Sequence, residues 1–255
     1  MCHPDAPSIP SPTPDAQQEV RVPLRSGEEL PALYAHPDHD GPGVLVVADI
    51  YGRSPFYEDL AARLATAGLH ALLPEYFFRE GPLAERSREA AFARRRGLDD
   101  PRALADLSTA IDWLRGQPGV VGARTGTIGF CMGGTFVLNL AADRDDLATV
   151  CYYGFPQPPP LTQTPAPAPL DQLDSITGPI LGLWGDQDES VGMDNVAKLA
   201  EGLQARRVDF THVIYHGLGH GFLRAMAAAG DAGRSDAVDS FARALAFYRR
   251  HLTTT

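Results

Sequence analysis

Residues 126 to 134 read Gly126-Thr-Ile-Gly-Phe-Cys-Met-Gly-Gly134, and this stretch decides the fold. The β-branched residues at its start favour a short strand, and residues 135–143 favour a helix. A strand that turns into a helix around G-x-C-x-G is a nucleophile elbow, here with cysteine where serine is usual. Glycines two residues before and after Cys131 suit a turn that strains the backbone and brings neighbouring backbone close. The stretch therefore predicts that Cys131 projects from the end of a strand.

The surroundings of Cys131 favour its thiolate form, because the following helix would present unpaired N–H groups and the positive end of its dipole. A buried, inert cysteine in a glycine-rich turn is the alternative interpretation, and a short motif alone does not decide between the two. The other cysteines, Cys2 and Cys151, are too few and too scattered for a disulfide framework or a zinc site. We assign Cys151, which lies in an apolar run, to packing.

Length and charge restrict the class of protein. The 255 residues suit one α/β domain, which we place at 19–255 after a proline-rich, disordered tail at 1–18. The 22 basic and 32 acidic residues give 22 − 32 = −10, a net charge that disfavours nucleic acid and anionic membranes as partners. The first residues lack the pattern of a signal peptide, so we expect a cytoplasmic protein.

The remaining sequence alternates between apolar strands and helices. Two segments at 20–24 and 32–36 predict an antiparallel hairpin. Continuous apolar strands then alternate with helices, which indicates a mostly parallel sheet with helices on both faces. Expected strands are 43–48, 70–73, 126–130, 149–153, 180–184 and 212–215; expected helices are 56–67, 83–96, 103–115, 135–143, 195–205 and 235–251. The proline-rich segment (residues 155–178) cannot be a helix or a central strand, and either covers a site or is floppy.

A nucleophilic cysteine needs a base and an acid that orients the base, in the chain order nucleophile, acid, histidine. Asp188 follows the strand at 180–184, and His220 lies in a glycine-rich loop after the strand at 212–215. Asp186 is the second choice for the acid, because a turn aspartate often only caps backbone. The spacing of His212, His216 and His220 would suit a metal on a helix, but the residues between them are strand-like, so we predict no metal.

An oxyanion formed during acyl transfer needs two backbone donors. Met132 directly after the nucleophile supplies one, and Ile50, after the apolar strand at 43–48, is placed to supply the other. Asp49 at the end of the same strand either modulates the ionisation of the thiol or caps a turn.

With these motifs in order, residues 20–250 resemble the dienelactone hydrolase (carboxymethylenebutenolidase) family of the α/β-hydrolase superfamily. The shared motifs are Gly129-Phe-Cys-Met-Gly-Gly134, Asp49-Ile-Tyr-Gly52 and Tyr152-Tyr-Gly154. The family binds a substrate carboxylate with two arginines, which correspond here to Arg88 in Glu85-Arg-Ser-Arg-Glu89 and Arg224 four residues after His220. Without the family, Arg88 would be assigned to a solvated helix face.

The resemblance implies a cysteine hydrolase that needs no cofactor and opens a carboxylate-bearing lactone or related ester through an acyl-cysteine. A general esterase or thioesterase, or a noncatalytic redox-sensing or binding domain, are the alternatives. Three departures concern the substrate: Asp49 replaces glutamate, Phe92 replaces a residue with an aromatic hydroxyl, and the proline-rich segment is longer than usual. The sequence does not determine whether the protein is a monomer or a dimer.

Overall fold

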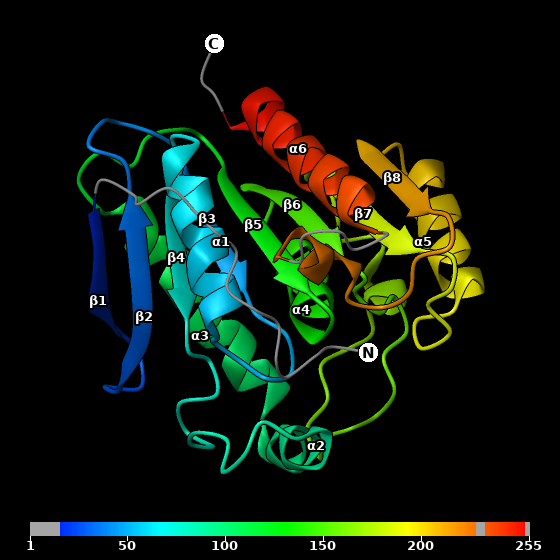
Figure 1. Cartoon of the computed structure of the whole chain (residues 1–255), viewed down its shortest axis with the longest axis horizontal. Coiled ribbons are helices and arrows are strands. Elements are labelled where there is room, and N and C mark those ends of the chain that lie inside the picture. The colour runs from blue at the N-terminus through cyan, green and yellow to red at the C-terminus, as the bar shows by residue number, and fades with distance from the viewer. Residues whose placement is uncertain (1–15, 228–232, 253–255) are drawn as a thin grey trace.

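The computed structural model describes residues 16–227 and 233–252, which form a mixed sheet of eight strands in the order β1-β2-β4-β3-β5-β6-β7-β8 (Figure 1). β1 and β2 are antiparallel, β2 is antiparallel to β4, and all later neighbours are parallel. The fold is thus the predicted one, an α/β-hydrolase sheet with an N-terminal hairpin. The strands are β1 (Ala16–Pro23), β2 (Glu29–His36), β3 (Gly43–Val47), β4 (His70–Pro74), β5 (Thr125–Phe130), β6 (Leu147–Tyr152), β7 (Ile180–Gly185) and β8 (Phe210–Tyr215).

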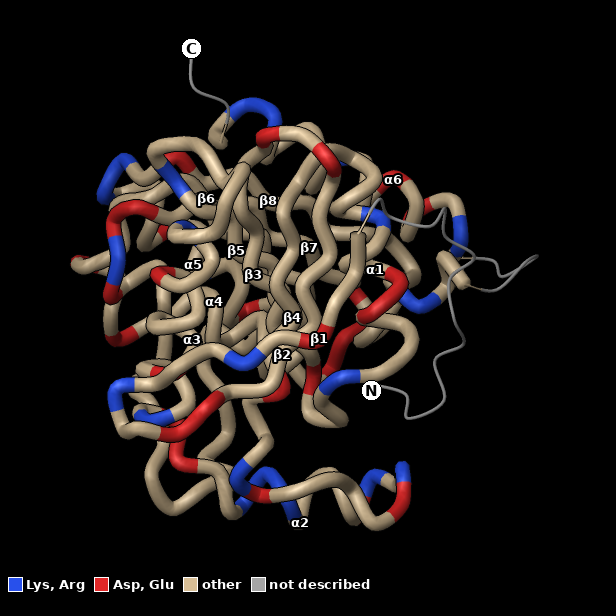
Figure 2. Tube along the Cα trace, turned by 90° about the vertical axis from the view of Figure 1, so that its left-hand side faces the viewer, with Lys and Arg blue, Asp and Glu red and all other residues tan. Residues whose placement is uncertain are grey.

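Helices cover both faces of this sheet. Figure 2 shows α3, α4 and α5 on one side and α1 and α6 on the other, with α2 beyond the body of the sheet. Every residue of β3, β4, β5, β6 and β7 is buried, which explains why these strands read as continuous apolar runs. The helices are α1 (Pro55–Thr66), α2 (Arg88–Gly97), α3 (Asp100–Arg115), α4 (Met132–Asp143), α5 (Met193–Ala205) and α6 (Arg234–His251), with 3-10 helices η1 (Pro169–Gln172) and η2 (Phe222–Ala227).

The boundaries of the tail and of the charged helix are among those that differ from the prediction. Residues 16–18, which we assigned to the tail, pair with β2 as the beginning of β1, and the rest of the predicted tail lies outside the described residues. The charged helix begins at Arg88 rather than near residue 83. The Ser87 hydroxyl accepts a hydrogen bond from the Ala90 amide at 3.2 Å and caps the helix there.

The strand order places the site. β4 lies on one side of β3 and β5 on the other, so the chain reverses its direction of winding between β3 and β5. Loops at the carboxyl ends of two such strands diverge and leave a crevice in which ligands bind. The loop after β3 carries Ile50, and the loop after β5 carries Cys131. The topology therefore brings the elbow and the predicted second oxyanion donor to one edge of the sheet.

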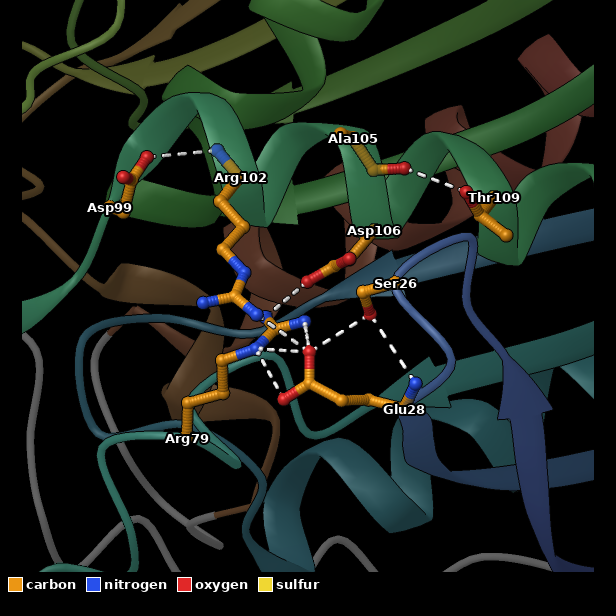
Figure 3. Close-up of polar contacts among 8 residues, drawn as sticks. All are labelled: Ser26, Glu28, Arg79, Asp99, Arg102, Ala105, Asp106 and Thr109. Carbon is orange, nitrogen blue, oxygen red and sulfur yellow. Dashed lines mark hydrogen bonds and ion pairs between the residues drawn. The ribbon is translucent and has the colours of Figure 1, made fainter.

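A charge network fixes the segment that leads from β4 towards α2. Nε of Arg79 donates to both carboxylate oxygens of Glu28 in the β1–β2 turn, each at 3.1 Å, and Nη2 donates to one of them at 2.8 Å (Figure 3). Arg79 also pairs with Asp106 of α3. Arg102 of α3 donates to the same Glu28 carboxylate at 2.6 Å. These contacts join the β1–β2 turn, the segment after β4 and α3, which are far apart in the sequence.

None of the helices in the described part of the chain combines the length and apolar character that crossing a bilayer requires.

Candidate active site

Cys131 occupies a strained elbow between β5 and α4. Its backbone angles are φ 56° and ψ −117°, which L-residues rarely adopt and which cost on the order of 1–3 kcal/mol. The two flanking glycines are required by space: a Cβ on Gly129 would overlap the carbonyl oxygen of Gly133, and one on Gly133 would overlap the backbone at the end of β3. Cys131 is 8% exposed. The structure therefore places its side chain at the edge of the sheet, in the predicted turn.

His220 and Asp188 form the hydrogen-bonded pair that the sequence predicted. The Nδ1 atom of His220 lies 2.6 Å from Oδ2 of Asp188, and both side chains are buried. The second carboxylate oxygen accepts a hydrogen bond from the Ser190 hydroxyl at 2.5 Å and two weaker ones from the amides of Ser190 and Val191. With Nδ1 bound to the carboxylate, Nε2 of His220 is the ring nitrogen available to the thiol.

Electrostatics support a charged pair at this site. Burial lowers the pKa of His220, but the charge of Cys131, the hydrogen bonds to Asp188 and Cys131 and the charge of Asp188 outweigh it and raise the pKa to about 9. For Asp188, burial raises the pKa, and the hydrogen bond and charge of His220 outweigh it, so the net pKa is lowered. The imidazolium is therefore the favoured form of His220 at neutral pH, beside the Asp188 carboxylate.

Aromatic side chains hold the His220 ring. The ring of Tyr153 lies edge-on at 5.0 Å between centroids, and that of Phe155 lies at 5.5 Å. Tyr153 itself has φ 38°, a second strained residue beside the site. The sequence analysis assigned no contact with His220 to Ser190 or to these two rings, because such contacts join segments that are far apart in the chain.

The second-choice acid has a different partner. Asp186 accepts hydrogen bonds from the Gly217 amide at 2.7 Å and lies 2.5 Å from Nδ1 of His216, which is 95% exposed. These contacts tie the loop after β7 to the loop after β8. Among the residues that the structure describes, no group of three His, Cys, Asp or Glu side chains is arranged to hold a metal ion.

The two predicted oxyanion donors, Ile50 and Met132, line the same cavity as Cys131. Met132 is the first residue of α4, where backbone N–H groups have no partner within the helix. Two side chains that the sequence analysis missed hold the loop that carries Ile50. Tyr76 donates to the carbonyl oxygens of Ala48 and Asp49, both at 2.9 Å, and Arg94 of α2 donates to the carbonyl of Ile50 at 3.1 Å.

Asp49 caps the turn after β3. Its Oδ1 atom accepts a hydrogen bond from the Tyr51 amide at 2.8 Å, and its carbonyl accepts one from Gly52 at 2.9 Å. These contacts match the capping interpretation. A role of Asp49 in modulating the thiol stays a prediction.

A cavity of about 600 Å³ lies in front of Cys131 and His220. Arg88, at the start of α2, lines it, with its guanidinium 5.3 Å from the ring centre of Phe92. Arg224 lies in η2 and is not among the described residues that line the cavity. The proline-rich segment covers the cavity, which is the first of the two interpretations that the sequence left open for it. The residues of this segment that line the cavity are Phe155, Gln157, Pro158, Pro159, Pro160, Leu161, Pro165, Ala166, Pro167, Ala168 and Asp171.

Comparison with known proteins shows the family to which the chain belongs. The sequence profile of the dienelactone hydrolase family matches residues 30–252. A carboxymethylenebutenolidase from Rhodococcus opacus is 33% identical over 99% of this chain and 98% of its own length. Carboxymethylenebutenolidase 2 from Cupriavidus pinatubonensis is 38% identical over 72% of this chain and 74% of its own length.

Solved structures show the same relationship. A structure from Klebsiella pneumoniae subsp. pneumoniae MGH 78578 that carries the dienelactone hydrolase name superposes with a TM-score of 0.82. It is 29% identical and covers 92% of this chain and 98% of its own. The fold, the elbow and the matched sequence together show that the chain belongs to the dienelactone hydrolase family and is a hydrolase of lactone or ester bonds.

Proposed function

We propose that the protein hydrolyses a carboxylate-bearing lactone or related ester through an acyl-cysteine intermediate on Cys131. The observation that carries this proposal is the convergence of a strained cysteine, the His220–Asp188 pair and two oxyanion donors on one cavity. The names of the relatives support the substrate class, because a carboxymethylenebutenolide is a lactone that bears a carboxylate.

The reaction has two steps. The Cys131 thiolate attacks the carbonyl carbon, and the amides of Ile50 and Met132 hold the oxyanion. The C–O bond breaks, the leaving oxygen takes the proton of His220, and the acyl group stays on sulfur. Water then gives a proton to His220 as it attacks the thioester. The C–S bond breaks and the carboxylic acid leaves; in a lactone the acid and the former leaving oxygen belong to one molecule.

A transient acyl adduct is the direct test of this mechanism. When the protein is mixed with an activated ester and quenched within its first turnovers, mass spectrometry should find the acyl mass on the peptide that contains Cys131. A redox-sensing domain would show only an oxidised cysteine or a mixed disulfide. Turnover without an adduct on Cys131 would contradict the acyl-cysteine proposal.

Replacement of Arg88 should change selectivity rather than general activity. We expect Arg88→Ala to lower kcat/KM for a carboxylate-bearing lactone by about 10- to 100-fold, the effect of losing charge-assisted hydrogen bonds. Turnover of a neutral ester should stay within about twofold, because it makes no such bond. Arg86→Ala is the matched control, since Arg86 lies two residues earlier and is not among the described lining residues. Arg224→Ala tests the arginine that rests on the family resemblance. Equal losses on both substrates would rule out carboxylate binding by the altered residue.

The raised pKa of His220 predicts an alkaline limit to activity. A group with a raised pKa stays protonated at neutral pH and loses its proton as pH rises through the raised value. We therefore expect kcat/KM to be level near neutrality and to fall as pH rises through about 9, because the leaving oxygen then lacks its proton donor. A pH–rate profile with an ester that does not itself ionise measures this limit. If kcat/KM has already fallen to its lower limit at pH 7, the predicted alkaline limit near pH 9 is wrong.

A neutral ester or thioester remains the second candidate substrate. The specific observation in its favour is the apolar character of the cavity wall formed by the proline-rich segment. The kinetic comparison of cis- and trans-dienelactone with neutral p-nitrophenyl esters distinguishes the two substrate classes.

A further inference from the structure

We infer that the cavity takes a substrate with a bulky apolar substituent, an aryl or alkyl group, attached to the lactone or ester carbonyl held at Cys131. This inference rests on the proposed function and adds the class of substrate to it. It is carried by the size of the cavity, by the partners of its polar lining groups and by the way in which the proline-rich segment is fastened.

The cavity is too large for a small lactone alone. Its volume of about 600 Å³ lies in the range of sites that enclose drug-sized ligands. A small carboxylated lactone has about ten non-hydrogen atoms, and even at the ~30 Å³ that a water molecule occupies in the liquid these would fill about half of it. The remaining space needs a further group or ordered water.

Polar groups in the wall behind the catalytic residues are already bound to protein. Thr135 of α4 accepts a hydrogen bond from the Phe155 amide at 2.9 Å, and Asn139, one turn further, donates to the Pro167 carbonyl at 2.8 Å. Arg95 and Asp100 form a buried two-pronged ion pair, with N–O distances of 2.7 and 2.8 Å. Because the charges of Arg95 and Asp100 cancel, a second charged group of the substrate would gain little there.

Two acceptors in this wall have no hydrogen-bond partner among the described residues, namely Oδ1 of Asn139 and Oδ1 of Asp100, which meets Arg95 only as an ion pair. Both oxygens are shielded from solvent. An apolar substituent placed against Asn139 therefore removes no hydrogen bond that the protein makes without substrate.

The rest of the wall is apolar. The proline-rich segment contributes proline rings, which have no backbone N–H to offer a ligand. Phe92, Phe136 and Phe155 face the same cavity from α2, from α4 and from the chain after β6. Of the other polar lining residues, Arg88, Gln157 and Asp171 are exposed. The expected arrangement thus has a polar opening with Arg88 and an apolar interior.

Hydrogen bonds fasten the proline-rich segment in place as a wall. The Ala166 amide donates to the Asp100 carboxylate at 3.2 Å, and the Asp100 amide donates to the Thr164 carbonyl at 3.2 Å. The Leu170 amide donates to the Pro156 carbonyl at 3.1 Å and closes the segment on itself. A wall fixed at both ends keeps the volume open in the absence of substrate, so a ligand that fills it is bound without the cost of ordering a loop.

A series of p-nitrophenyl esters tests this inference with the complete protein. Each methylene that becomes fully buried is worth about fourfold in kcat/KM. We expect kcat/KM to rise at least about tenfold from acetate to hexanoate, and the phenylpropionate to exceed the acetate as well. A second series of acetate esters with methyl to hexyl alcohols examines the other side of the carbonyl. A rise in either series supports the inference, and flat or falling values in both overturn it.

Two variants locate the effect in the cavity. Leu161→Trp and Ala168→Phe add volume at residues that line it, outside the triad and the oxyanion loop. Each should remove most of the rise while leaving acetate turnover within about twofold, because the short ester does not reach the filled space. Gln163→Trp is the matched control, because Gln163 is an exposed residue of the same segment and is not among the described lining residues. If the control removes the rise as much as the two cavity variants do, or if the cavity variants leave the rise intact, the substituent binds elsewhere and the inference is wrong.

The same experiments distinguish a failure of this inference from a failure of the proposed function. Turnover of acetate with an acyl adduct on Cys131, but no dependence on chain length, would leave the cysteine mechanism standing and overturn the bulky substituent. No turnover of any ester and no adduct would overturn both.

Discussion

Cys131→Ala is expected to abolish hydrolysis while the fold persists. Without the sulfur no acyl-enzyme forms, and the donors and bound water that remain replace only a small part of the catalysis, so we expect kcat to fall at least about 10⁴-fold. The side chain borders the cavity and its backbone strain is retained with alanine, so the free energy of unfolding should change by only about 1 kcal/mol. Ester hydrolysis, circular dichroism and thermal unfolding measure the two effects.

Cys151 supplies the matched control for this experiment. It is fully buried in β6, burial raises the pKa of its thiol to about 12, and the thiol lies 3.4 Å from the Gly134 carbonyl as a donor. A thiol in this state is inert, so Cys151→Ala should keep activity within a few-fold and lose only some stability. A folded Cys131→Ala protein with substantial activity would show that Cys131 is not the nucleophile.

Asp188→Asn is expected to have the second largest effect. The carboxylate holds Nδ1 of His220 at 2.6 Å and keeps Nε2 towards the thiol; an amide would favour the wrong tautomer and remove a negative charge. We expect kcat/KM to fall by about 10³- to 10⁴-fold. Because the Asp188 charge raises the pKa of His220, its loss should move the alkaline limit of the residual activity to lower pH.

Asp186→Asn makes the same chemical change two residues earlier. Asp186 pairs with the exposed His216, so this variant should keep activity within about twofold. Asp188 also accepts bonds from Ser190 and Val191, so its replacement should lower stability by about 1–3 kcal/mol, and rates must be compared where both variants are folded. If the Asp186 variant were the more damaged of the two, the assignment of the acid would be wrong.

Local chemistry explains why much of the fold was predictable. The glycines around Cys131 are needed within a few residues of the turn itself, and the apolar strands reflect burial on both faces. Strands, helices and the elbow therefore follow from short windows of sequence. The predicted start of α2 was wrong because a charged segment does not by itself mark where a helix begins, whereas the hydroxyl of Ser87 caps the helix there.

The chain order nucleophile, acid, histidine could also be predicted from the sequence, because the topology of the sheet brings the carboxyl ends of β5, β7 and β8 to one edge. The choice between Asp186 and Asp188 required the structure. Both lie in one loop, and only the tertiary arrangement shows that one meets His220 and the other His216.

By itself, the sequence determined the α/β-hydrolase fold, the elbow at Cys131 and the candidate partners Asp188 and His220. Only the tertiary structure decided that the proline-rich segment covers the site, that Arg88 lines the cavity and that Arg95 and Asp100 are paired in its wall. The physical reason is range: elements and turns depend on neighbours along the chain, whereas the Asp100–Ala166 and Asn139–Pro167 bonds join residues 66 and 28 positions apart. The cavity in front of Cys131 is made of such contacts, and they determine what the thiol can reach.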